Sequence, residues 1–171
     1  CIPDTMRCLQ HQDIDYKLAL IARYLKPRIV IVDGTYALDR HGPMYGDAVK
    51  TDLLLLSDNT VAADAMGTRL MGFDPRHIRH IAVAERTGLG STNLNDITLN
   101  TEWQRHVKHF TVKRTLVDTV SRLLFCSDAL ARLVMQSPLT PFVYQVARLL
   151  RSKEEKEVAG QLGKTKDIGL Y

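Results

Sequence analysis

The chain has 171 residues, of which 45% are hydrophobic and 25% are charged, and it contains 10 Gly and 6 Pro. These proportions are those of an ordinary globular protein, and they exclude collagen-like, low-complexity and wholly disordered classes. The net charge of +4 is unevenly placed, because residues 1–100 carry 11 Lys and Arg against 12 Asp and Glu, whereas residues 101–171 carry 12 against 7.

The basic C-terminal part suits an acidic protein partner, an anionic membrane surface or nucleic acid, although charged helix faces are most often simply solvated. Aromatic residues make up only 6% of the chain, and no zinc-finger spacing or aromatic RNA-binding strand is present, so nucleic acid is not expected as a partner. The charge-free stretch 133–147 contains Pro138 and Pro141 and is shorter than the ~20 residues that a membrane span needs. No membrane span is therefore expected.

The chain contains three cysteines, Cys1, Cys8 and Cys126, without a Cys-x-x-Cys pair. This usage is typical of a reducing compartment and predicts a cytoplasmic protein. Because the chain opens with Cys1-Ile2-Pro3-Asp4, we expect it to be a fragment of a longer protein.

The first predicted element is an amphipathic helix over residues 14–25. Its apolar residues Ile14, Leu18, Ile21 and Leu25 recur at helical spacing after Asp13, which suits the N-cap position. Because Pro27 disfavours the α conformation in the residue before it, the helix is expected to end near Lys26.

Two short apolar runs, 29–32 and 53–56, are predicted to be strands. Neither run alternates with polar residues, which indicates strands covered on both faces, as in an α/β sheet. The stretch 35–51 between them, with Gly42-Pro43 and Gly46, reads as a long functional loop. We favour a parallel order, which brings Asp33 and Asp58 together at the carboxyl ends; an antiparallel order separates them.

Further along the chain, Asn59 is expected to cap a helix that ends near Gly72, and Asp74-Pro75 is expected to start another that ends near Gly88. Residues 96–99 alternate as an edge strand does. The pattern is helical from Lys113 onward, with a frayed helix and a loose tail over 153–171.

These elements predict a layered α/β fold. The sheet is expected to be mostly parallel or mixed and flanked by helices, with a helical C-terminal region. The predicted domains are an α/β domain over residues 1–110 and a helical extension over 111–171. This extension packs on the same domain or reaches toward a partner.

An ordered series of short blocks in this sequence is similar to a known family. The blocks are Lys26-Pro27, Val32-Asp33-Gly34, Gly42-Pro43-x-x-Gly46, Ser57-Asp58-x-x-Val61-Ala62-x-Asp64-Ala65, Leu70-Met71-Gly72-Phe73-Asp74-Pro75 and Gly88-Leu89-Gly90. Over roughly residues 9–100 the chain resembles the domain-of-unknown-function family numbered 362. Arg40-His41 depart from the family pattern, because small or amide residues are expected before Gly42-Pro43.

The resemblance implies a domain of unassigned activity that often occurs in iron–sulfur proteins. In such proteins a ferredoxin-type domain lies elsewhere in the full-length chain, and we expect one as a partner here. No iron–sulfur cluster is expected within this chain, because it lacks a closely spaced Cys run.

A group of aspartates is the first candidate for chemistry. Converging carboxylates suit a divalent cation, or a general base if one of them is desolvated, and we assign the catalytic role to Asp33 and Asp64. The alternative is that these residues are turn formers and solvated side chains. The group comprises Asp33, Asp39, Asp47, Asp58 and Asp64.

The loop is the second candidate, because cationic donors and glycines let backbone N–H groups approach a phosphate or carboxylate. Gly-Pro and Gly are also ordinary turn residues, so a plain turn is the alternative. The predicted ligand-binding residues are Gly34, Arg40, His41, Gly42, Pro43, Gly46, Ser57 and Asp58.

The leading hypothesis is a domain that binds an anionic small molecule or a divalent metal in this cleft, with redox-linked activity in a larger iron–sulfur protein. The alternative is a non-catalytic module that docks an iron–sulfur partner or a membrane surface through basic helices. The basic residues concerned are Lys113, Arg114, Arg122, Arg132, Arg148 and Arg151.

Overall fold

A computed structural model describes the central part of the chain and several shorter stretches after it. The described residues are 8–40, 46–114, 119, 120, 123, 127–135, 137, 138, 140–143, 145, 146 and 149. The chain divides into two compact units. We call residues 13–40 and 47–112 the hairpin unit, and residues 1–12, 41–46 and 113–171 the terminal unit.

The hairpin unit is built on one β-hairpin. Strands β1 (Val30–Asp39) and β2 (Asp47–Ser57) pair antiparallel, from Val30 opposite Ser57 to Asp39 opposite Asp47. The predicted parallel order is therefore wrong for the described sheet, and so is the long loop over 35–51, because only residues 40–46 connect the strands. Residues 47–51 of the predicted loop belong to β2, in which Val49, Thr51, Leu53 and Leu55 form one alternating set of half-buried side chains.

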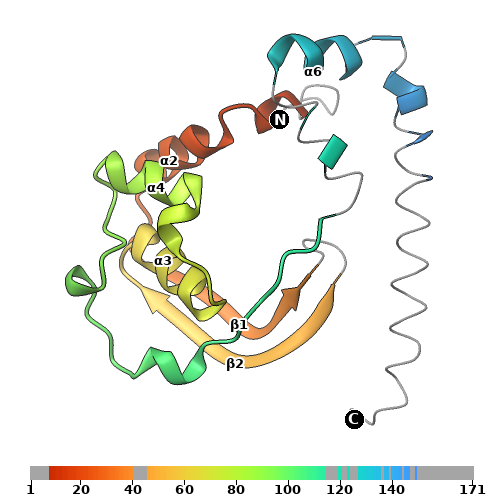
Figure 1. Cartoon of the computed structure of the whole chain (residues 1–171). Coiled ribbons are helices and arrows are strands. Elements are labelled where there is room, and N and C mark those ends of the chain that lie inside the picture. Colours follow the sequence, from red (N-terminus) through yellow and green to blue (C-terminus); the bar gives the residue numbers. More distant parts are fainter. Residues whose placement is uncertain are drawn as a thin grey trace, which may run out of the picture. The chain divides into compact units, whose positions relative to one another are not determined.

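The hairpin is strongly bent (Figure 1), and its register is irregular between Gly34 and Tyr36. Such an irregularity adds a residue to one strand and increases its local twist. Thr51 donates a short hydrogen bond from its hydroxyl to the Gly34 carbonyl across this point. A Cβ on Gly34 would lie 3.1 Å from the Leu53 carbonyl oxygen, so a side chain would fit poorly there.

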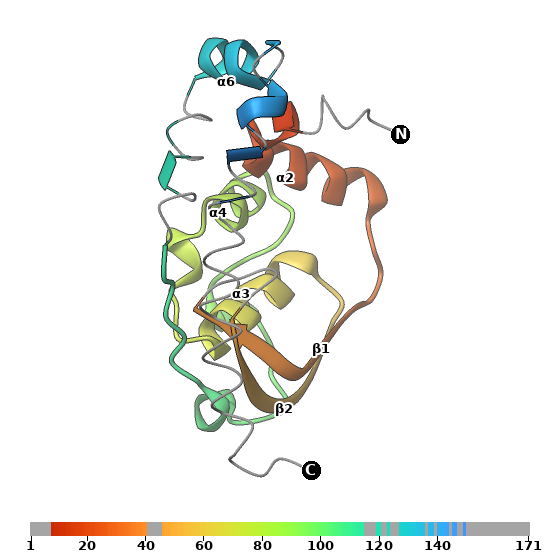
Figure 2. The same ribbon diagram turned by 90° about the vertical axis from the view of Figure 1, so that its right-hand side faces the viewer.

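The sheet is covered on one face only within the described part of the chain. Leu53 and Leu55 are half-buried, whereas Leu54 and Leu56 are 65% and 61% exposed. Helix α3 (Thr60–Leu70) lies beside the hairpin in both Figure 1 and Figure 2. We call the exposed face, which carries Ile31, Leu54 and Leu56, the outer face of the hairpin.

Helix α2 (Ile14–Leu25) forms where it was predicted. Asp13 does not cap it in the predicted way, because Asp13 is left-handed (φ 52°) and its side chain makes no capping hydrogen bond. The helix ends at Lys26, which is also left-handed (φ 43°) and donates its N–H to the Ala22 carbonyl. Ala19 is buried where α2 packs against α4.

Helix α3 confirms its predicted ends, whereas the single helix predicted from Asp74 to Gly88 is a 3₁₀ turn followed by a separate helix. The Asn59 side chain accepts a hydrogen bond from the Ala62 N–H at 3.0 Å, and Gly72 follows the helix with φ 83°. Asp74 caps a short 3₁₀ turn, η2 (Pro75–His77), by accepting from the Arg76 N–H at 2.9 Å. Helix α4 (Arg79–Arg86) then ends before Gly88, whose φ is 75°.

Small and medium apolar side chains from α3 and α4 make the core of the hairpin unit. Pro75 and Phe110 are buried as well. The buried positions on the two helices are Val61, Ala63, Ala65, Met66, Ile81 and Val83.

The segment after α4 contains 3₁₀ turns η3 (Leu94–Asp96) and η4 (Trp103–His106). The edge strand predicted over 96–99 is therefore wrong, because Asn93 accepts from the Asn95 N–H and starts a turn instead. The chain then returns along the hairpin unit, and the N–H groups of Lys108 and Phe110 donate to the carbonyls of Leu70 and Met71 at 2.8 and 3.0 Å.

The described part of the terminal unit is partly helical, but Lys113 and Arg114, where the predicted helical region begins, are not in a helix. It contains the 3₁₀ turn η1 (Cys8–His11) and α6 (Asp128–Met135), which contact each other, and Ala131 of α6 is buried. Residues 140–143 are also helical. The tail predicted over 153–171 lies outside the described residues. The mixed α/β class is confirmed, whereas the layered arrangement stays a prediction.

Candidate functional site

The aspartates that were expected to converge are spread over the hairpin unit. Asp33 stands opposite Leu54 within β1, so it lies on the outer face, whereas Asp64 lies on α3. Asp58 comes directly after β2, at the end of the sheet that is farthest from the Asp39–Asp47 pair. The expectation that the acids ending the two apolar runs face one shared pocket is wrong, because the strands are antiparallel.

Asp33 is exposed, and its side chain is engaged locally by Thr35, two residues further along β1. Its Oδ1 accepts hydrogen bonds from the Thr35 N–H at 2.9 Å and the Thr35 hydroxyl at 2.6 Å. These two bonds lower the pKa of Asp33, since they stabilise its ionised form. A carboxylate held in this way is poorly suited to act as a general base.

Asp64 is in a different environment. Partial desolvation on α3 raises its pKa, and the nearby His80 opposes this rise. The side chain still counts among the exposed ones, so the effect is limited by water. Within the described residues, no group of three or more His, Cys, Asp and Glu side chains is arranged to hold a metal ion.

The end of the hairpin carries a compact set of polar interactions. Arg40 pairs with Asp47 (Nε to Oδ2, 2.8 Å), and Asp39 accepts from the Thr111 N–H at 2.7 Å. The Thr111 bond is the main cause of the lowered pKa of Asp39. Arg40 is thus neutralised locally instead of being presented to an anion. The predicted loop residues His41, Gly42 and Pro43 lie outside the described residues, and Gly46 is half-buried beside them.

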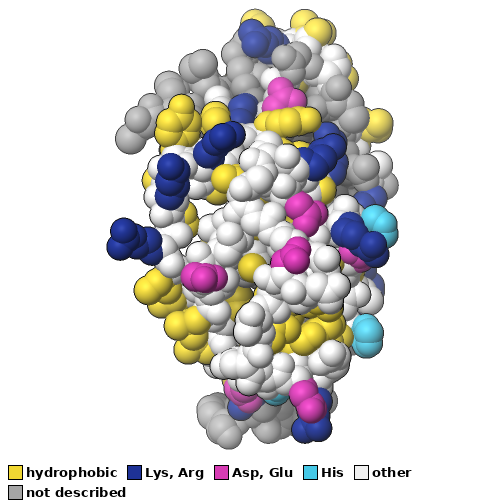
Figure 3. Space-filling model, turned by 90° about the vertical axis from the view of Figure 1, so that its left-hand side faces the viewer, with side chains coloured by type: hydrophobic (Ala, Val, Ile, Leu, Met, Phe, Trp, Pro, Cys, Tyr) yellow, Lys and Arg dark blue, Asp and Glu magenta, His cyan; other side chains and the backbone are white. Residues whose placement is uncertain are grey.

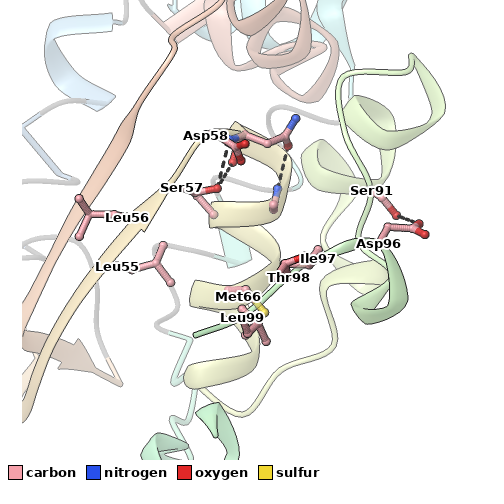
Figure 4. A pocket seen from close by; sticks show the side chains of 13 residues that line it. Leu55, Leu56, Ser57, Asp58, Met66, Ser91, Asp96, Ile97, Thr98 and Leu99 are labelled. Carbon is pink, nitrogen blue, oxygen red and sulfur yellow. Dashed lines mark hydrogen bonds between the residues drawn. The ribbon is translucent and has the colours of Figure 1, made fainter. Parts of the chain in front are cut away.

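A pocket of about 430 Å³ lies at the other end of β2, where Ser57 and Asp58 lead into α3 (Figure 4). Its walls come from the end of β2, the first two turns of α3 and the segment 91–99. The residues that line it are Leu55, Leu56, Ser57, Asp58, Asn59, Ala62, Ala63, Met66, Ser91, Asp96, Ile97, Thr98 and Leu99. Of the predicted ligand-binding residues, only Ser57 and Asp58 belong to it.

Asn59 is the structural centre of this pocket, and the sequence-based prediction assigned it only a capping role. Its Oδ1 accepts from the Ala62 N–H, and its Nδ2 donates to the Leu89 carbonyl at 2.8 Å. The Ser57 hydroxyl bonds the Asn59 backbone on both its N–H and its carbonyl side. A Cβ on Gly90 would overlap the Asn59 side chain, so the Gly88-Leu89-Gly90 block permits this close approach.

Hydrogen bonds also fix the segment 91–99. The Thr92 carbonyl accepts from Arg69 Nη2 at 2.6 Å, and the Thr92 hydroxyl donates to Glu85 at 3.0 Å. At the pocket itself, the Ser91 hydroxyl donates to Asp96 Oδ2 at 2.6 Å, as Figure 4 shows. The polar lining therefore consists of hydroxyls, an amide and two carboxylates, Asp58 and Asp96, and none of the described Lys, Arg and His residues lines the pocket.

The hairpin unit is thus a mixed α/β unit, in which α3 packs on a bent hairpin and a partly apolar pocket lies at one end of β2. The family model described as "Domain of unknown function (DUF362)" matches residues 1–69. The resemblance to this family is therefore confirmed over these residues. The matched stretch includes α2, both strands and nearly all of α3, whereas the blocks from Leu70 to Gly90 lie beyond it.

The chain is also similar to a thylakoid-associated protein of Synechocystis sp. (strain ATCC 27184 / PCC 6803 / Kazusa). The two sequences are 31% identical over 99 residues, which cover 54% of this chain and 31% of that protein. The chain thus spans about a third of the relative's length. No solved structure matches the chain. Among the described residues, no helix is long and apolar enough to cross a membrane.

Proposed function

We propose that the hairpin unit binds a small organic molecule in the pocket formed by Ser57, Asp58, Asn59 and the segment 91–99. The supporting observation is the lining itself, which combines apolar side chains with hydroxyls and two carboxylates. A volume of about 430 Å³ falls within the range of small-molecule sites. Because carboxylates attract cations and no cationic side chain lines the pocket, the ligand is uncharged or positively charged and has an apolar part.

This proposal changes the chemistry expected from the sequence. An anionic ligand would face Asp58 and Asp96 without a compensating lining cation, and a divalent metal would find no group of three ligands in the described part of the chain. We retain Ser57 and Asp58 as ligand-binding residues. The catalytic role of Asp33 and Asp64 and the binding role of Gly34, Arg40 and Gly46 are not part of this proposed site.

Three probes with the same six-carbon chain test the charge preference: hexylamine, 1-hexanol and hexanoate. Binding is measured as a shift in thermal unfolding of the 171-residue chain. We expect hexylamine to bind best and hexanoate worst, since the ammonium group approaches Asp58 while the alkyl chain contacts Met66. The gain from one partly exposed ion pair is up to about fivefold in affinity.

Two variants make the test specific. Asp58→Asn is expected to reduce hexylamine binding to the level of 1-hexanol, and Met66→Trp is expected to fill the pocket and abolish binding of all three probes. Asp52→Asn is the matched control, because Asp52 is exposed, lies outside the pocket and has φ 49°, which Asn tolerates. Preferential binding of hexanoate, or binding unaffected by Met66→Trp, would contradict the proposal.

A second candidate function is a docking module for another domain of a longer protein. The observation that favours it is the exposed outer face of the hairpin, where Ile31, Leu54 and Leu56 are all more than half exposed. The two apolar runs predicted coverage on both faces, and the chain spans only 31% of its relative. We propose a ferredoxin-type domain as the occupant, in line with the family resemblance.

Docking is tested by titrating the chain with a purified ferredoxin and measuring binding by calorimetry at low and high salt. Docking through the outer face predicts salt-insensitive binding that Leu54→Asp abolishes. Docking through basic residues of the terminal unit, of which Lys113, Arg114 and Arg132 are exposed, predicts binding that salt weakens. Arg122, Arg148 and Arg151 lie outside the described residues. Absence of binding under both conditions would reject this candidate.

The location of the protein stays a prediction. The relative's name places that protein with thylakoids, whereas the cysteine usage of this chain predicts the cytoplasm.

A further inference from the structure

Thr92 anchors the segment 91–99, which forms one wall of the pocket. It is a polar residue, yet it is only 4% exposed. Its N–H and its hydroxyl both donate to the Glu85 carboxylate, the hydroxyl at 3.0 Å, and its carbonyl accepts from Arg69 Nη2 at 2.6 Å. All three polar groups of Thr92 are therefore bound by charged side chains, and such hydrogen bonds are roughly twice as strong as neutral ones.

The two charged side chains come from different helices. Glu85 lies on α4, and Arg69 lies on α3, where its Nη1 also donates to the Ala65 carbonyl at 3.3 Å. We call Arg69, Glu85 and Thr92 the Thr92 clamp. Because α3 and α4 carry most of the buried core of the hairpin unit, the clamp ties the wall to the best-packed part of this unit.

The clamp reaches the pocket through the residues next to Thr92. Ser91 lines the pocket, and its hydroxyl accepts from the Asn93 N–H at 3.0 Å and donates to Asp96 Oδ2 at 2.6 Å. Asp96 and the residue that follows it, Ile97, line the pocket as well. The position of Thr92 therefore determines where Ser91, Asp96 and Ile97 stand in the wall.

The rest of the wall is held loosely within the described part of the chain. Residues 93–96 and 98–100 are exposed, and the hydrogen bonds of residues 93–99 are made inside the segment itself. Figure 3 looks onto the side of the hairpin unit that carries α4 and this segment, and most of the surface in the middle of the view is neither hydrophobic nor charged. Few apolar contacts therefore hold the wall, and the clamp is its main attachment after the Asn59–Leu89 bond.

We propose that Arg69 and Glu85 are positioning residues of the pocket, which hold the wall in its binding position through Thr92 before a ligand arrives. This inference rests on the proposed function, because it concerns the same pocket. Neither Arg69 nor Glu85 lines the pocket, so they act on a ligand only through the wall. A wall that is already ordered raises the affinity, because binding does not then have to order it.

Thr92→Val tests the clamp, because valine has nearly the shape of threonine but lacks the hydroxyl that donates to Glu85. We expect it to weaken hexylamine binding by about threefold to tenfold, as the loss of one hydrogen bond to a charged group allows. It is also expected to speed hydrogen exchange at the amides of residues 95–97 by about tenfold. Thr92→Ser keeps a hydroxyl and is expected to recover most of the affinity.

The matched control is Thr87→Val, which removes a hydroxyl near the clamp but outside the wall. The Thr87 hydroxyl donates to the carbonyls of Val83 and Ala84, both at 3.0 Å, so its loss is expected to leave hexylamine binding unchanged. Circular dichroism checks that every variant keeps its helices. If Thr92→Val does not, Glu85→Gln, which keeps one acceptor oxygen, replaces it with the same expected results.

A double-variant experiment separates positioning from a general loss of stability. Ile97 belongs to the wall, whereas Asp58 lies just before α3. In the Thr92→Val chain, Asp58→Asn is expected to weaken hexylamine binding by the same factor as in the unmodified chain, whereas Ile97→Ala is expected to lose most of its effect. A merely structural clamp would change both effects equally.

The outcomes distinguish this inference from the proposed function. If hexylamine does not bind to the unmodified chain, the ligand pocket and the role of the clamp are both overturned. If hexylamine binds, three results would overturn the clamp alone: Thr92→Val binding as tightly as the unmodified chain, an equal loss in Thr87→Val, or equal changes in the effects of Asp58→Asn and Ile97→Ala.

Discussion

Asn59 joins β2, α3 and the segment after α4, so its replacement gives the most informative stability measurement. Asn59→Ala removes the helix cap on the Ala62 N–H and the bond from Nδ2 to the Leu89 carbonyl. Loss of an N-cap costs about 0.5–2 kcal/mol, and loss of a part-buried hydrogen bond costs about 0.5–1.5 kcal/mol. The expected decrease in the free energy of unfolding is therefore about 1–3.5 kcal/mol.

Urea denaturation followed by circular dichroism measures this decrease, and two further variants separate its causes. Asn59→Ser keeps an oxygen that caps α3 but lacks the donor to Leu89, so it is expected to fall between Asn59→Ala and the unmodified chain. Asn100→Ala is the matched control at an exposed position, with an expected effect within about 0.5 kcal/mol. The reasoning is refuted if Asn59→Ala changes the free energy no more than Asn100→Ala does.

Two further predictions concern the room for a Cβ at two glycines and the pH dependence of one ion pair. A Cβ on Gly90 would lie 2.8 Å from the Val61 Cβ, whereas nothing lies within 4 Å of a Cβ on Gly67. Gly90→Ala is therefore expected to lower the free energy of unfolding by about 1–3 kcal/mol, and Gly67→Ala to raise it by about 0.5–1 kcal/mol. Equal urea midpoints for the two variants would contradict this. Arg76 lowers the pKa of Asp74 in the folded chain below its ordinary value of 3.8. The ion pair with Arg76 therefore stabilises the fold fully above pH 3.8, and this stabilisation is lost as the pH falls through the lower pKa of the folded chain. The difference in Tm between the unmodified chain and Asp74→Asn should therefore shrink in acid below 3.8, and a pH-independent difference would reject it.

Local signals in the sequence predicted the helix ends better than the helix starts, because Asp13 makes no capping bond and Asp74 caps a 3₁₀ turn instead of α4. The caps at Asn59 and Asp74 and the glycines Gly72 and Gly88 act within a few residues of themselves, so their effect does not depend on the rest of the fold. Helix 14–25 was also predicted correctly, but its periodicity could not show which face the chain covers. The stripe Ile14, Leu18, Ile21 and Leu25 is amphipathic without being buried.

Strand direction and the site depended on contacts between distant residues, which short patterns do not encode. Four consecutive leucines, 53–56, are compatible with burial on both faces and also with an open sheet face, and the exposure of Leu54 and Leu56 shows that one face is open. The direction of the strands follows only from their pairing, which places Asp39 opposite Asp47. The same pairing separates Asp33 from Asp58. Ser91 and Asp96 could not be assigned to a pocket from the sequence, because the segment that carries them is held beside Asn59 by the Asn59–Leu89 bond.

The central claim is that the pocket beside Asn59 is a ligand site, and Met66 offers a direct probe of it. Met66 is buried and lines the pocket, whereas Met71 at the end of α3 does not. In a chain labelled at its methionine methyl groups and titrated with hexylamine, the nuclear magnetic resonance signal of Met66, assigned with Met66→Leu, is expected to shift in a saturable way while that of Met71 stays in place. A Met66 signal that does not respond, or an equal response of both signals, would contradict the claim.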